Sequence, residues 1–74
     1  MTFEVEWDFP ALVAFDQIRW PRSADVAGAV YRFARERAPL LPSGAYAVRG
    51  AGYRIAVRVD RRAQNVLVLY LQPV

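Results

Sequence analysis

Strict alternation of apolar and polar side chains in residues 53–60 limits this chain more than any other feature of its sequence. The apolar positions of the run are Tyr53, Ile55, Val57 and Val59. The positions between and after them are Arg54, Ala56, Arg58 and Asp60. Because the side chains of a strand point alternately to the two faces of a sheet, the run predicts a strand with one buried and one solvated face.

A glycine-rich break before this run predicts a tight hairpin. Residues 45–49 also alternate, and residues 50–52 separate them from the run at 53–60. A two-residue turn at Gly50 and Ala51 keeps all the apolar side chains on one face, and glycine in its first position fits a type II′ turn. The cross-strand pairs expected from this register are Val48 with Tyr53, Tyr46 with Ile55, and Ala47 with Arg54.

A third strand-like run, VLVLYL at residues 66–71, follows the polar turn residues 61–65. It is apolar at every position, which is typical of a strand that is covered on both faces. We therefore expect this strand at the centre of the sheet.

The first part of the chain predicts one strand and two helices. Residues 2–7 alternate as a strand, and residues 9–19 follow as a helix that Asp8 caps. The helix is expected to turn an apolar stripe inward: Phe9, Leu12, Phe15 and Ile18. A second helix is expected from a cap at Ser23 to about Ala38, with Gly28 and nearby alanines allowing close packing against the first helix.

The composition excludes several kinds of chemistry. The chain has no cysteine and no histidine, so disulfides, the common zinc sites and histidine-dependent catalytic triads are excluded. The acidic residues are scattered along the sequence, and we expect no metal and no cofactor. The longest apolar run is too short to cross a bilayer, and the acidic start does not resemble a signal peptide. These features suit a cytoplasmic protein with a single domain over residues 1–74.

All ten basic residues are arginine, and with seven acidic residues the net charge is +3. Arg49, Arg54 and Arg58 are expected on the solvated face of the hairpin, with only alanines between them. Arginine binds phosphate through two donors at once, so this face can hold and stabilise a phosphate. It can equally be an ordinary solvated sheet face. Tyr53 and Tyr70 could stack on nucleobases, although the alternation favours a place in the core for both.

The hairpin resembles a segment of the RelE/ParE toxin superfamily. The residues that carry the resemblance are YAVRGAGYR at 46–54 and the alternating apolar run that follows. The order of strand, helix, helix and three strands matches that superfamily over most of the chain. The resemblance implies an α+β fold in which two antiparallel helices pack on a four-stranded, mainly antiparallel sheet.

The resemblance also implies a function: the toxin of a bacterial type II toxin–antitoxin system, with a cognate antitoxin as its partner. In the RelE-like reading the chain is a ribosome-dependent mRNA endoribonuclease that inhibits translation. Arg54 and Arg49 would then be catalytic, and Arg49, Arg54 and Arg58 would bind RNA phosphate.

Two departures from the family pattern keep other functions open. Ala47 occupies a position that is often basic, and residues 72–74 do not continue into the basic segment and terminal tyrosine of such toxins. The alternatives are a ParE-like toxin that acts on DNA gyrase and a catalytically degenerate relative that only binds an antitoxin.

Overall fold

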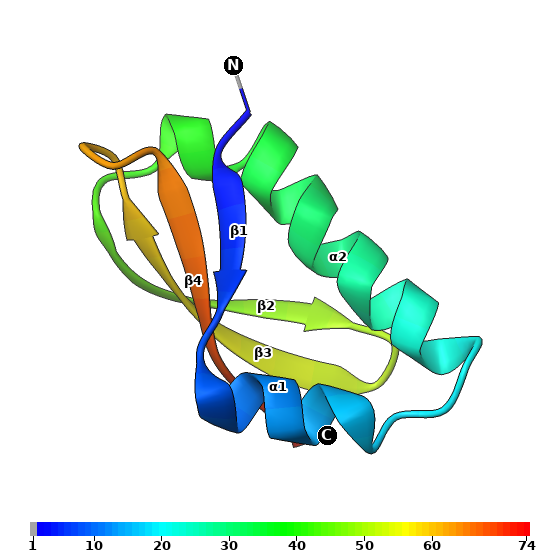
Figure 1. Ribbon diagram of the computed structural model, residues 1–74. Coiled ribbons are helices and arrows are strands. Elements are labelled where there is room, and N and C mark those ends of the chain that lie inside the picture. Colours follow the sequence, from blue (N-terminus) through cyan, green and yellow to red (C-terminus); the bar gives the residue numbers. More distant parts are fainter. Residues whose placement is uncertain (1) are drawn as a thin grey trace.

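In the computed structural model, four strands form one sheet and two helices pack on it (Figure 1). The structure describes residues 2–74. The strand order is β1-β4-β3-β2, with β1 parallel to β4 and the other two pairs antiparallel. The elements are β1 (Glu4–Trp7), α1 (Phe9–Asp16), α2 (Arg22–Glu36), a 3-10 helix η1 (Ala38–Leu40), β2 (Gly44–Gly50), β3 (Tyr53–Asp60) and β4 (Asn65–Pro73). This confirms the predicted fold class and the central position of β4.

The core lies on one face of the sheet. Alternation places Ile55, Val57 and Val59 of β3 on that face, and each is at most 1% exposed. Helix α2 covers them with its own apolar side: Val26, Val30, Phe33 and Ala34. The opposite face of the sheet, called the outer face below, carries the remaining side chains of β2 and β3.

The hairpin turn lies one residue later than the sequence predicted. Gly50 pairs with Tyr53, and the turn residues are Ala51 and Gly52, with φ of 54° and 82°. Two positive φ values in succession are typical of a type I′ turn, which matches the twist of the flanking strands. The predicted type II′ turn and its cross-strand pairs were therefore wrong. Because the register moved by two residues, every side chain still points to its predicted face.

Gly50 is needed for a close approach between β2 and α2. A Cβ atom built on Gly50 would lie 2.5 Å from the Cβ of Ala29. Gly28, by contrast, has no neighbour within 4 Å of such an atom, so its predicted role in helix–helix packing was wrong. Helix α1 packs mainly on β4, and α2 packs on β2, η1 and β1.

Helix α1 is shorter than predicted and is apolar on its solvent side as well. Asp8 caps it as expected, accepting a 2.9 Å hydrogen bond from the Phe9 amide. Ala11 is fully buried and Phe15 packs against the core, but Phe9 is 73% exposed and Leu12 44%. The predicted inward stripe was therefore wrong at these two positions, because α1 faces the sheet along its Ala11 side.

Helix α2 begins and ends differently from the prediction. Its N-cap is Pro21, without a capping side chain, so the predicted cap at Ser23 was wrong. The helix ends at Glu36, and the short helix η1 takes up the expected last turn around Ala38.

A β-bulge interrupts the pairing of β3 with β4. Ala56 pairs with Tyr70 and Val57 pairs with Val68, which leaves Leu69 as an extra residue in β4. Val68 and Leu71 are both buried, while Tyr70 is 50% exposed. The predicted cover on both faces of this strand was therefore wrong, and so was a core position for Tyr70.

The contact between Gly50 and Ala29 predicts a selective loss of stability. We expect Gly50→Ala to lower the free energy of unfolding by about 1–3 kcal/mol, because the added methyl group overlaps the Ala29 side chain. Gly28→Ala should instead raise stability by up to roughly 1 kcal/mol, since it adds helix propensity in open space. Urea denaturation measures both effects. Ala29→Gly should restore much of the loss in the Gly50→Ala background, and equal stability of both alanine variants would contradict the contact.

Candidate functional site

Three arginines project from the outer face, as the sequence predicted. Arg49 of β2 lies directly opposite Arg54 of β3, and Arg58 lies opposite Ala45. All three arginines are exposed. Strands rise by about 3.3 Å per residue, so Arg58 is roughly 13 Å from Arg54 along β3. The structure therefore brings Arg49 and Arg54 together as a pair, with Arg58 further along the same face.

The Arg49–Arg54 pair has no acidic partner within residues 2–74. The ion pair found in this part of the chain joins Arg35 to Glu36, on α2. Asp60, on the same strand as Arg54, accepts a 3.0 Å hydrogen bond from the Ala63 amide and shapes the β3–β4 turn. Like charges directly opposite each other destabilise a strand pair. An anion bound between Arg49 and Arg54 would remove that repulsion.

A shallow hollow of about 270 Å³ lies beside this pair on the outer face. Its floor consists of small side chains: Ala45, Ala47 and Ala56. Arg54 and Tyr70 border it, and Tyr46 lies at its edge. The hydroxyl of Tyr46 donates a 2.7 Å hydrogen bond to the Pro42 carbonyl, so Tyr46 is engaged in the structure. Tyr70 is the aromatic residue of the hollow whose exposed ring faces solvent.

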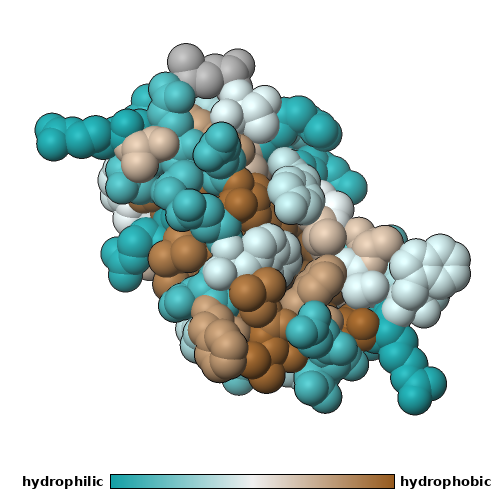
Figure 2. All heavy atoms as spheres, viewed as in Figure 1, coloured by the Kyte–Doolittle hydropathy of each residue, from teal (hydrophilic) through white to brown (hydrophobic). Residues whose placement is uncertain are grey.

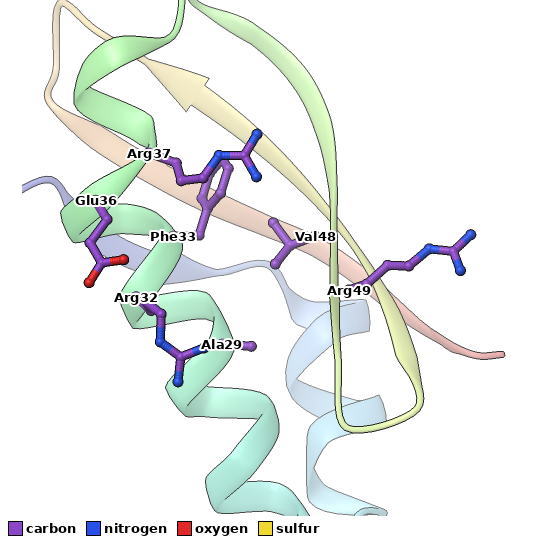
Figure 3. Close-up of a pocket in the computed structure, with 7 residues that line it drawn as sticks. All are labelled: Ala29, Arg32, Phe33, Glu36, Arg37, Val48 and Arg49. Carbon is purple, nitrogen blue, oxygen red and sulfur yellow. The ribbon is translucent and has the colours of Figure 1, made fainter.

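A second hollow, of about 140 Å³, lies between α2 and the edge strand β2 (Figure 3). In Figure 3, Val48 points toward Phe33 of α2, whereas Arg49 points away from the helix. The Arg37 guanidinium lies 5.9 Å from the centroid of the Phe33 ring. Arg32, Glu36 and Arg37 of α2 line this hollow together with Arg49 of β2. This hollow could not be predicted from the sequence, because the strand that lies beside α2 could not be known.

Arg61 has a structural role instead. Its guanidinium donates hydrogen bonds to the carbonyls of Pro39 and Leu41, at 2.7 and 2.9 Å. Its backbone amide donates to the Ser43 hydroxyl at 2.9 Å. Arg61 therefore ties the segment after α2 to the β3–β4 turn, and it adds nothing to the outer face.

Residues 2–74 contain no group of three or more acidic, histidine or cysteine side chains that could hold a metal ion. None of the helices described is both long enough and apolar enough to cross a membrane.

Comparison with solved structures identifies the fold. A chain of the archaeal RelE–RelB complex from Pyrococcus horikoshii OT3 matches with a TM-score of 0.79 and 19% identity, over 99% of this chain and 96% of that chain. A chain of the toxin–antitoxin complex RelBE2 from Mycobacterium tuberculosis matches with a TM-score of 0.69 and 24% identity, over 100% of both. No protein-family model and no curated protein matches the sequence.

Its own structure defines the chain first as a small α+β protein with exposed arginines on one sheet face and helices on the other. More specifically, it has the fold of the RelE toxins. The predicted resemblance to the RelE/ParE superfamily is confirmed for the fold.

The unpaired arginines predict an unusual response of stability to substitution. We expect Arg54→Gln to raise the free energy of unfolding by roughly 0.2–1 kcal/mol at low ionic strength, because it removes the repulsion from Arg49. Arg58→Gln is the matched control, since Ala45 lies opposite it. Urea denaturation at about 10 mM and about 1 M salt measures both, and the gain should shrink at high salt. Equal effects of the two substitutions would argue against repulsion between Arg49 and Arg54.

Proposed function

We propose that this chain is the toxin of a type II toxin–antitoxin system, a RelE-like endoribonuclease that cuts mRNA on the ribosome in the cytoplasm. The observation that carries the proposal is the Arg49–Arg54 pair, which lies without an acidic partner beside an open hollow. The fold, shared with chains of two toxin–antitoxin complexes, supports the same function.

The chemistry assigned to the arginines is stabilisation of charge. Cleavage of an RNA chain builds negative charge on the oxygens of the scissile phosphate, and guanidinium groups stabilise that charge through paired hydrogen bonds. Arg54 and Arg49 are the proposed catalytic residues, because they can hold one phosphate from two sides. Arg58, roughly 13 Å along the strand, would bind a neighbouring phosphate of the same chain.

The proposed partner of the toxin is a cognate antitoxin that covers apolar surface on α1. Figure 2 shows apolar side chains gathered over this helix, where Phe9 is 73% exposed and Leu12 and Val13 are each 44% exposed. Such surface on a small domain is typical of an interaction site. An amphipathic helix would cover the apolar side of α1, and an acidic segment of the same partner would neutralise the outer face.

Growth inhibition tests the catalytic role of Arg54. Expression of the wild-type chain without an antitoxin should stop bacterial growth, and Arg54→Ala should restore it, because the phosphate loses half of its binding pair. Arg62→Ala is the matched control: it removes the same charge from the exposed β3–β4 turn and should leave the growth arrest unchanged. Colony counts after induction measure the effect.

The target is identified by mapping mRNA ends after induction. Cuts within codons that require the ribosome are the expected result. Intact mRNA together with cleaved DNA would contradict the proposal and indicate a ParE-like toxin that acts on gyrase. Undisturbed growth with the wild-type chain would instead indicate a relative that only binds an antitoxin.

Co-expression with the adjacent reading frame tests the partner. A partner at 100 times its dissociation constant adds about 2.7 kcal/mol to stability, so the melting temperature should rise by about 10 °C or more.

Leu12→Gln should weaken co-purification, because it places a polar group in the apolar surface of α1. Tyr31→Gln, on α2, is the control and should co-purify normally. An unchanged melting temperature and no bound partner would favour a self-sufficient monomer.

A further inference from the structure

The β-bulge in β4 determines where Tyr70 points. Val66 and Val68 are fully buried, so regular alternation would bury residue 70 as well. The extra residue Leu69 shifts the alternation by one position, so that Leu71 is buried and Tyr70 is 50% exposed on the outer face. Bulges occur often beside active sites, where they re-aim a side chain.

The re-aimed ring lies next to the arginine pair. Arg54 lies opposite Gln72, and Tyr70 is two residues before Gln72 on the same face. Diagonal neighbours of this kind are about 7–8 Å apart. The long side chain of Arg54 and the ring of Tyr70 can therefore contact adjacent parts of one bound molecule.

Among residues 2–74, none forms a hydrogen bond with the Tyr70 hydroxyl or an aromatic contact with its ring, and the side chain is 50% exposed. Tyr70 lies opposite Ala56, with Ala47 beyond it on β2, and these small side chains leave the hollow open beside the ring. Tyr46 differs, since its hydroxyl is bonded to Pro42 and its ring lies 6.5 Å from that of Phe33. Tyr70 thus combines an accessible aromatic surface, an adjacent hollow and a neighbouring cation.

We propose that Tyr70 stacks on a nucleobase of single-stranded RNA, next to the phosphate held by Arg49 and Arg54, an inference that rests on the proposed function. Aromatic side chains beside a basic groove bind single strands in this way, because every base offers a flat face. Alanine at positions 47 and 56 leaves room for the base over the sheet. The site therefore takes an unpaired base with its phosphate, and a base-paired helix would not expose the face that Tyr70 needs.

Nuclear magnetic resonance titration tests this site directly, without cleavage. The probe is a 2′-O-methyl adenosine trinucleotide, which keeps bases and phosphates but lacks the free 2′-hydroxyl. A matching abasic trinucleotide keeps the sugar–phosphate backbone but lacks the bases. With the wild-type chain, the adenosine probe should shift the Tyr70 ring protons upfield through the ring current of the stacked base, and the abasic probe should not.

Substitution separates stacking from general loss of structure. Tyr70→Ala should weaken binding of the adenosine probe about tenfold or more and leave binding of the abasic probe unchanged. Tyr70→Phe should retain most of the affinity, because stacking needs the ring and not the hydroxyl. Tyr31→Ala is the matched control: Tyr31 is also 50% exposed but lies on α2.

The outcomes distinguish this inference from the proposed function. Equal affinity of the wild-type chain and Tyr70→Ala for the adenosine probe would overturn the stacking site, even if mRNA were cleaved through Arg54. Failure of the wild-type chain to bind the probe would overturn it as well. Selective loss in Tyr70→Ala, without any mRNA cleavage by the wild-type chain, would support the base site while the nuclease function failed.

Discussion

The close approach of α2 to β2 at Ala29 and Gly50 is the contact on which the rest of the arrangement depends. A Cβ atom at residue 50 would lie 2.5 Å from that of Ala29, so only glycine fits there. The contact holds α2 on one face of the sheet, over the valines of β3, and leaves the outer face uncovered. Gly50 is the last residue of β2, and the turn follows it at Ala51 and Gly52. The resulting register places Arg49 directly opposite Arg54.

The faces of the hairpin could be predicted from the sequence, whereas its register could not. A side chain keeps its face when the register moves by two residues, so the outer position of the three arginines did not depend on the turn. The position of the turn did depend on packing, because both Gly50 and Gly52 offer the freedom that a tight turn needs. Gly50 lies against Ala29, 21 positions earlier in the sequence, and the turn forms at Ala51 and Gly52. The sequence therefore located the basic face but paired Arg54 with Ala47.

Two further errors have a similar cause. The strand β4 can be predicted from the sequence, but the extra residue Leu69 cannot, since VLVLYL is apolar throughout and carries no mark of a bulge. The apolar stripe of α1 was misplaced because the helix is apolar on all sides, so that periodicity could not choose the buried side. Ala11 is the residue of α1 that is fully buried. In each case the uniform hydrophobicity of a segment hid the feature that the tertiary structure determines.

The outer face carries two features that do not favour stability, a pair of like charges and a β-bulge. Arg49 and Arg54 lie opposite each other without an acidic partner among the described residues. In β4, a bulge interrupts the regular pairing with β3 and turns Tyr70 outward. Departures from local consistency tend to occur at functional sites, because the rest of a sequence is selected to agree with its fold. Here the like-charged pair and the re-aimed tyrosine lie within one diagonal step on the same face. The proposed nucleotide would account for both, since its phosphate would relieve the repulsion and its base would cover the exposed ring.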